Sequence, residues 1–125
     1  MNVREVIARR HAERAALIAR AQRFADALDP ALGVRAVVVF GSVARGDFND
    51  HSDIDVLVVA EHLPPRPLDR YAALGEAPDP IQAVAWTPRE WLGEVERGNP
   101  VATEAGEHGV WLLGAPAVLD DRRRP

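Results

Sequence analysis

The chain has 125 residues and a formal net charge of −4, and 47% of its residues are hydrophobic. This length suits one domain with a sizeable core, and the acidic balance argues against an extensive nucleic-acid surface, which normally carries a basic excess. The absence of cysteine excludes disulfides, zinc–thiolate sites and cysteine nucleophiles. Lysine is absent too, so any cationic contact to a phosphate must come from arginine.

The first predicted element is a helix from Val3 to Leu28, a segment without Gly or Pro that consists largely of Ala, Arg, Glu and Leu. Apolar residues recur along it at spacings of three and four, which indicates one buried stripe, and Asp29-Pro30 ends it. Six arginines occupy much of the remaining surface, and we expect this arginine face to be solvated or paired with an acidic partner: Arg4, Arg9, Arg10, Arg14, Arg20 and Arg23.

Two nearly all-apolar runs, Val34 to Phe40 and Ile54 to Ala60, are typical of buried strands. After the first run we expect Ser42 to N-cap a short helical turn that extends through Arg45 and is closed by Gly46. A polar loop then leads into the second strand.

The second half of the chain alternates short helices with apolar segments. Thr87-Pro-Arg-Glu90 is a strong helix start, with a Thr N-cap, Pro at the first helical position and Glu placed for a capping box. The expected elements are a helix at 68–74, a strand at 81–86, a helix from 88 to about 98, a helix at 100–107 and a short apolar segment at 110–113. We expect residues 1–119 to form a single domain, followed by a flexible tail at 120–125. The tryptophans of these apolar segments are predicted to lie in the core: Trp86, Trp91 and Trp111.

The relative direction of the strands follows from the polar residues at their ends. The bend at Gly41-Ser42 can face Asp53 and Asp55 only if the first two strands run antiparallel. A third strand at 81–86 that contributes to the same place would lie parallel to the second. We therefore predict an α+β (mixed α/β) fold, with a three-stranded or slightly larger mixed sheet flanked by helices.

Two features of this central unit predict a metal–nucleotide site. Asp53 and Asp55 are two residues apart at the start of one strand, so their carboxylates point to the same side. They can therefore share Mg²⁺, which prefers oxygen ligands. Gly41 lets the backbone approach a phosphate closely, and Ser42 adds a hydroxyl and an N–H group. Arg45 fits either a phosphate contact or a surface arginine in a tight turn.

The residues around this site resemble a known family. The strings Phe40-Gly-Ser-Val-Ala-Arg-Gly46 and Ser52-Asp-Ile-Asp-Val-Leu-Val58 are similar, almost residue for residue, to the minimal nucleotidyltransferases of the polymerase-beta-type nucleotidyltransferase superfamily. The resemblance implies the nucleotidyltransferase fold and Mg²⁺-dependent transfer of a nucleoside monophosphate. The site residues it implies are the catalytic metal ligands Asp53 and Asp55 and the nucleotide-binding residues Gly41, Ser42 and Arg45.

The resemblance also implies a partner and an acceptor. Proteins of this branch often pair with a HEPN-domain protein in bacterial toxin–antitoxin modules, and some transfer AMP from ATP onto a tyrosine of that partner. The expected activity is therefore AMP transfer from ATP to a hydroxyl of a HEPN-type toxin, with this chain as the antitoxin. A chain of this length lacks an additional acceptor-holding domain, which agrees with an acceptor presented by another protein.

One position departs from the family's pattern. The third aspartate of the family normally lies second in the strand before the Thr-Pro-x-Glu helix start, and here that position is Gln82. An amide cannot act as a carboxylate base, and it is a weaker ligand for a second cation. Asp79 and Glu76 are the nearby substitutes. Two alternatives therefore stay open: a catalytically impaired, nucleotide-binding antitoxin that acts by binding its toxin, and a transferase acting on a small molecule.

Other features set limits on location and partners. The N-terminal segment lacks the apolar centre of a signal peptide and no apolar run is long enough to span a bilayer, so we expect a cytoplasmic protein. The four histidines show no metal-ligand spacing, although His51 is close to the aspartates in sequence. Arg122 to Arg124 are expected to form a solvated tail rather than a nucleic-acid contact. The sequence leaves the oligomeric state open, a homo-oligomer included.

Overall fold

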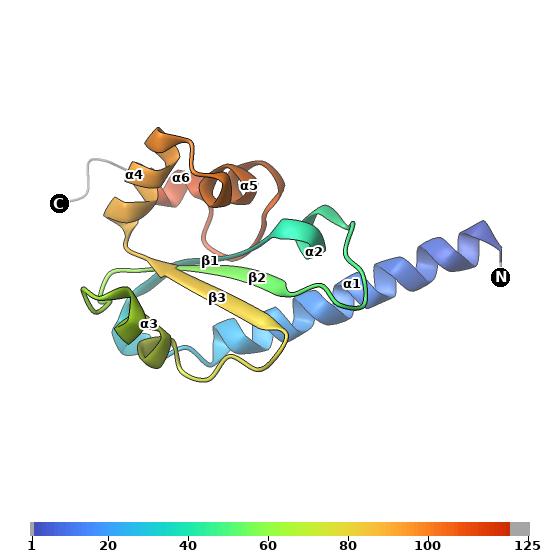
Figure 1. Cartoon of the computed structure of the whole chain (residues 1–125), viewed down its shortest axis with the longest axis horizontal. Helices are drawn as coiled ribbons and strands as arrows, with labels where there is room; N and C mark the ends of the chain where they lie inside the picture. The colour runs from blue at the N-terminus through green and yellow to red at the C-terminus, as the bar shows by residue number, and fades with distance from the viewer. Residues whose placement is uncertain (1, 121–125) are drawn as a thin grey trace.

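The computed structural model describes residues 2–120, so the predicted tail and its arginines at 122–124 lie outside the described residues apart from Asp120. The chain forms one four-stranded sheet with helices on both faces (Figure 1). The elements are α1 (Val3–Asp26), the 3-10 turn η1 (Pro30–Leu32), β1 (Val34–Phe40), α2 (Gly41–Arg45), β2 (Ile54–Ala60), α3 (Pro67–Leu74), β3 (Ile81–Trp86), α4 (Pro88–Arg97), α5 (Pro100–His108), β4 (Val110–Leu113) and α6 (Pro116–Leu119).

The strands are ordered β3-β2-β1-β4. β1 runs antiparallel to β2, and β2 runs parallel to β3, as the sequence predicted. The apolar segment at 110–113 adds a fourth strand, β4, antiparallel to β1 at the other edge. The predicted fold class, a mixed sheet of three or slightly more strands flanked by helices, is therefore confirmed.

Each face of the sheet has its own apolar layer. Helices α1 and α3 cover one face, and α4, α5 and α6 cover the other (Figure 1). Trp91 of α4 is 2% exposed, and its ring meets that of Trp111 edge-on at a centroid distance of 5.8 Å and that of Trp86 at 6.4 Å. The predicted core position is confirmed for Trp91, while the other two rings are half-buried against the same layer.

Most predicted helix ends agree with the structure, and the capping box of Thr87 and Glu90 is present at the start of α4. The prediction that Ser42 N-caps the turn after β1 is wrong. The N-cap residue is Phe40 and Ser42 lies inside the first turn of α2, because Gly41 itself adopts a φ of +76° and lets the turn start one residue earlier. Gly46 closes α2 in the left-handed conformation, as expected.

The N-terminal part of α1 projects beyond the rest of the molecule (Figure 1). Its apolar side chains stay exposed there, with Val3 at 75%, Val6 at 44% and Ile7 at 50%. Further along, Ala21 and Phe24 are buried under the sheet. Within residues 2–120, no helix combines the length and the apolar character that crossing a bilayer would require.

A buried arginine ties the edge strand β3 to the helices on either side. Arg70 of α3 is 9% exposed and donates hydrogen bonds to the carbonyls of Pro64 (2.8 Å) and Ala85 (3.1 Å) and to Glu90 Oε1 (2.7 Å). Burial acts to raise the pKa of Glu90, but the hydrogen bonds from Thr87 and Arg70 outweigh it, so the net shift is downward. The network therefore holds α3, β3 and the start of α4 together.

We expect Arg70→Met to lower the free energy of unfolding by about 2 kcal/mol at neutral pH, because two carbonyls and a charged Glu90 lose their donor. Since the pKa of folded Glu90 is depressed, the part of this stabilisation that comes from Glu90 is present above the carboxyl's unfolded pKa of 4.5 and disappears as the pH falls through the folded value, whereas the two carbonyl hydrogen bonds remain. Denaturant unfolding followed by tryptophan fluorescence at several pH values measures both effects. The control Arg66→Met removes an exposed pair with Asp69 and should change little. Equal losses in both variants would contradict the assignment.

Candidate functional site

The end of β1 and the start of β2 meet at one point. Phe40, the last residue of β1, pairs directly with Asp55 of β2, and Gly41 follows immediately. A Cβ at Gly41 would overlap Asp55 Oδ2 and would lie 3.3 Å from its Cγ, so only glycine allows this approach. The structure thus brings the predicted bend and the predicted carboxylate into contact.

The two aspartates form a site whose negative charge is only partly balanced, by Arg45. Asp53 is exposed just before β2, Asp55 is half-buried, and within the described residues the Asp55 carboxylate accepts no hydrogen bond. Burial raises the pKa of Asp55 above its usual value, the charge of Asp53 raises it further, and Arg45 partly opposes both. A hard divalent cation would relieve this repulsion, so the donor set fits Mg²⁺.

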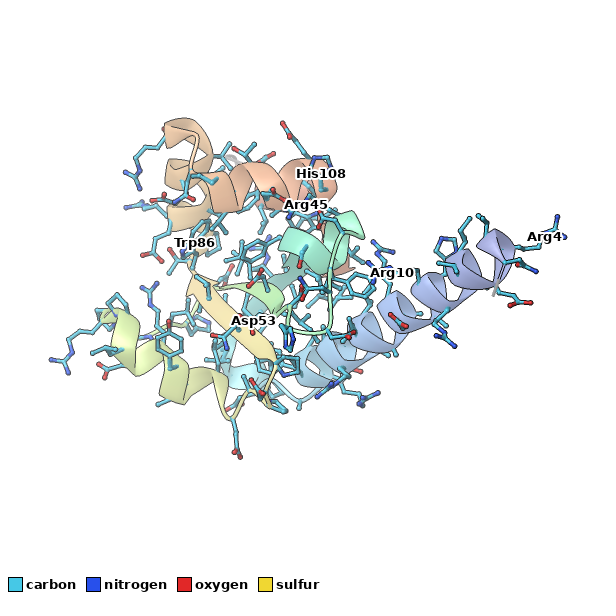
Figure 2. All side chains as sticks on the ribbon, turned by 45° about the vertical axis from the view of Figure 1, so that its right-hand side comes forward. Arg4, Arg10, Arg45, Asp53, Trp86 and His108 are labelled. Atoms are coloured by element: carbon cyan, nitrogen blue, oxygen red, sulfur yellow. The ribbon has the colours of Figure 1, made fainter. Side chains whose placement is uncertain are left out.

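Arg45 of α2 lies close enough for its charge to act on Asp55. Figure 2 labels Arg45 and Asp53. Its guanidinium is held by Glu104 of α5 at 2.7 Å and by Asp47 at 3.2 Å. Both of the roles predicted for Arg45 fit this position, because it is a partly exposed arginine in a tight turn whose charge reaches Asp55. Ser42 closes the turn by accepting N–H groups at its carbonyl, and its hydroxyl makes no hydrogen bond to the described part of the chain.

Gln82 lies beside Asp55 in the sheet. It is the parallel partner of Asp55 on β3 and is exposed, so it occupies the place where the resemblance leads one to expect a third carboxylate. No cluster of three or more acidic, histidine or cysteine side chains that could hold a metal occurs within residues 2–120. The site is therefore a pair of carboxylates next to an amide.

The two substitute carboxylates lie in different places. Asp79 lines a groove of about 580 Å³ together with Asp53 and His51, and its carbonyl accepts a hydrogen bond from Arg20 of α1 at 2.9 Å. Glu76 lines a separate hollow that contains neither of the paired aspartates. Asp79 is thus the nearer substitute, although it does not complete a three-carboxylate cluster.

Sequence reasoning missed the role of the α1 arginines. Arg10 donates to the carbonyls of Gly46 (3.1 Å) and Phe48 (2.6 Å) and stacks on the Phe48 ring at 3.9 Å. Arg14 donates to the carbonyls of Val43 (2.9 Å) and Ala44 (2.8 Å). These two arginines therefore have an intramolecular role in addition to the expected solvated or partner-bound face. Arg14 supplies donors to the last carbonyls of the short helix α2, which lack internal partners, and Arg10 supplies them to the segment that follows. The four-residue spacing of Arg10 and Arg14 was the only signal in the sequence.

Comparison with known proteins agrees with this geometry. The family model described as "Nucleotidyltransferase domain" matches residues 21–97, a range that includes the bend, both aspartates and Gln82. A solved structure of a "putative nucleotidyltransferase" from Sulfolobus solfataricus is similar in fold, with a TM-score of 0.60 and 21% identity over 82% of this chain and 84% of that one.

Two curated relatives come from Methanocaldococcus jannaschii. "Putative protein adenylyltransferase MJ1305" is 46% identical over 39 residues, which is 31% of this chain and 26% of that protein. "Putative protein adenylyltransferase MJ0141" is 50% identical over 28 residues, which is 22% of this chain and 28% of that protein. The similarity to each thus spans less than a third of its length. Because the family model matches more than half of the chain and the fold is shared, the chain belongs to the nucleotidyltransferase domain family.

Proposed function

We propose that this nucleotidyltransferase transfers AMP from ATP, in the presence of Mg²⁺, to a hydroxyl group of a partner protein. The observation that carries the proposal is the contact between Gly41 and Asp55, which places the bend after β1 directly against the half-buried member of the carboxylate pair. The proposed partner is a HEPN-domain toxin, for which this chain would be the antitoxin. That part rests on the family resemblance of the strings around the site.

Each residue has a distinct task in the proposed reaction. Gly41 and Ser42 hold the β- and γ-phosphates through backbone N–H groups and the free hydroxyl, and Arg45 adds positive charge. Asp53 and Asp55 hold Mg²⁺, which would neutralise charge on the phosphates. The acceptor oxygen attacks the α-phosphorus, the bond to the bridging oxygen breaks, pyrophosphate leaves, and the hydroxyl proton passes to solvent. Gln82, an amide, cannot take that proton.

The names of the two curated relatives support a protein as the acceptor. Both are named as protein adenylyltransferases, and their similarity to this chain, at 46% and 50% identity, is confined to short segments. Their names therefore suggest AMP as the group moved and protein as the acceptor class. A small-molecule acceptor remains the alternative that the same assay tests.

Gln82 favours a second candidate function. With an amide where the resemblance leads one to expect a third carboxylate, the chain would bind Mg²⁺–ATP and neutralise its partner without turnover. This binding-only antitoxin differs from the enzyme in one measurable respect. It would still protect cells from the toxin after its carboxylates were neutralised.

The first prediction concerns the transfer itself. Incubation with ATP labelled at the α-phosphate, Mg²⁺ and the product of the neighbouring gene should add one or more AMP units to that product, seen by intact mass. Asp55→Asn should lower the rate about 100-fold or more, because it removes a charged metal ligand.

The matched control is Asp69→Asn, which changes an exposed carboxylate of α3 that pairs only with Arg66 within the described residues. It should transfer at the wild-type rate. No mass gain with wild-type chain, together with toxin neutralisation by Asp55→Asn, would contradict the enzyme and support the binding-only candidate. AMP transfer to an aminoglycoside but not to the protein would support the small-molecule alternative.

The second prediction concerns the missing carboxylate. Gln82→Asp should raise turnover by about tenfold or more, since it places a base and a second-cation ligand beside Asp55. Gln82→Ala, which removes the amide without adding a charge, should not raise it. Single-turnover rates measure the change. A slower Gln82→Asp variant would show that the amide, not a carboxylate, suits this site.

The third prediction uses the electrostatics of Asp55. Because burial and Asp53 raise its pKa in the folded state, its ionised form destabilises the fold, so Asp55→Asn should raise Tm at pH 7 by about 2 °C. This advantage should vanish as the pH falls below the unfolded value of 3.8. Mg²⁺ at ten times its Kd should stabilise the wild type by about 1.4 kcal/mol and leave Asp55→Asn unchanged.

The same measurement gives the pH dependence of the metal. Protons compete with Mg²⁺ for Asp55, so the metal-induced rise in Tm should disappear on acidification at a higher pH than an ordinary aspartate would give. Differential scanning fluorimetry with and without Mg²⁺ would follow the metal-induced rise in Tm from about pH 8 down to about pH 4, near the ordinary aspartate pKa. An equal Mg²⁺ response in Asp55→Asn would place the metal elsewhere.

A further inference from the structure

The projecting half of α1 borders a groove that reaches Arg45. The groove has a volume of about 490 Å³ and separates α1 from the turn that follows α2. Val6, Ile7, Arg10 and Arg14 line it on the α1 side, and Arg45 lines it on the other. Gly41, Ser42, Asp53 and Asp55 do not line it, so the groove is linked to the site through Arg45, whose charge acts on Asp55.

The groove is basic in a chain that is acidic overall. Within the described residues no carboxylate lines it, although the chain carries a net charge of −4. Arg14 donates only to backbone carbonyls, and Arg10 has its nearest carboxylate, Glu13, at 3.8 Å. Carbonyls satisfy the donors of a guanidinium without neutralising its charge. The positive charge of this wall is therefore available to an acidic occupant.

The groove also has an apolar part. Val6 and Ile7 are about half exposed, and with Val3 they lie at helical spacings of three and four along the projecting half of α1. Figure 2 shows this half of α1, which carries Arg4, extending away from the body, whereas Arg10 lies where the helix passes α2. An unpacked apolar stripe next to arginines suits an amphipathic segment with apolar and acidic side chains.

We infer that this groove docks an acidic, amphipathic segment of the acceptor protein, whose apolar side chains pack on Val6 and Ile7 while its carboxylates face Arg10 and Arg14. The identification of the occupant as the acceptor rests on the proposed function. Docking there would present a neighbouring hydroxyl to the site from the side of Arg45. The groove would thus supply the acceptor binding that the carboxylate pair alone does not.

Two other occupants fit the groove less well. A polyphosphate would satisfy the arginines but would leave Val6 and Ile7 in contact with water. Single-stranded RNA binds through several exposed aromatic rings as well as charge. Of the two rings that line the groove, Phe48 is 6% exposed and covered by Arg10, which leaves His11 alone for stacking.

The test of the groove uses a synthetic amphipathic peptide with leucines on one face and glutamates beside them, and a matched peptide with lysines in place of the glutamates. Amide shifts of the ¹⁵N-labelled chain are followed by NMR during titration at low and high salt. The acidic peptide should shift the amides of Val6, Ile7, Arg10 and Gly46, less so at high salt, and the lysine peptide should not.

The double variant V6E/I7E should lose this response, because it places negative charge on the apolar wall at two exposed side chains of the projecting half of α1. The control Leu68→Glu alters an apolar residue of α3 that is 79% exposed and outside the groove, and it should respond like the wild type. Absence of shifts, equal shifts with both peptides, or groove shifts produced instead by Mg²⁺–ATP or oligouridine would each overturn the inference.

A kinetic arm separates this inference from the proposed function. V6E/I7E should raise the KM for the acceptor protein about tenfold while the kcat and the KM for ATP stay unchanged. If the wild type transfers AMP and this variant has an unchanged KM for the acceptor, the docking inference fails and the proposed function stands. If the acidic peptide binds in the groove but no AMP is transferred, the groove stands as an interaction surface and the proposed function fails.

Discussion

The site depends on the register between β1 and β2. Both strands are covered on their two faces, and a slip of one residue would turn every buried valine of one strand toward the wrong layer. The pairing of Phe40 with Asp55 is therefore fixed by the core rather than by polar contacts at the site. Glycine at 41 is what this register requires, because any side chain there would displace the Asp55 carboxylate. A half-buried carboxylate that accepts no hydrogen bond from the described residues is thus kept where a cation can reach it.

The turn after β1 is held from outside by α1. Helix α2 has five residues, too few to satisfy its own last carbonyls, and Arg10 and Arg14 bond to those carbonyls and to the loop that follows. Arg20 does the same for the stretch before β3. One helix therefore fixes the segments on both sides of the aspartates. Because α1 also carries the exposed apolar stripe, a partner bound to its projecting half would contact the support of the site directly.

The sequence predicted the sheet well because its signals were local. Unbroken apolar runs, the Thr87–Glu90 capping box and glycines at turns determine where elements begin and end, and the antiparallel direction followed from residues at the strand ends. The errors share a cause. The start of α2 depended on the φ of Gly41, and the role of the α1 arginines depended on contacts across about thirty positions of sequence. The pairing of Glu104 with Arg45 was missed for the same reason, since nothing near Glu104 in the sequence indicates it.

Gln82 changes how charge is balanced in the site more than it changes where a nucleotide would lie. Burial and the charge of Asp53 already raise the pKa of Asp55, and a third carboxylate beside it would add to the repulsion whenever no cation is bound. An amide leaves the fold less dependent on metal and favours one cation over two. The bend, the carboxylate pair and Arg45 make no hydrogen bond to Gln82 within the described residues, so this exchange alters the charge around them and not their hydrogen bonds. Under the proposed function, nucleotide binding and turnover would therefore vary separately in this chain, and the residue on β3 would affect the second.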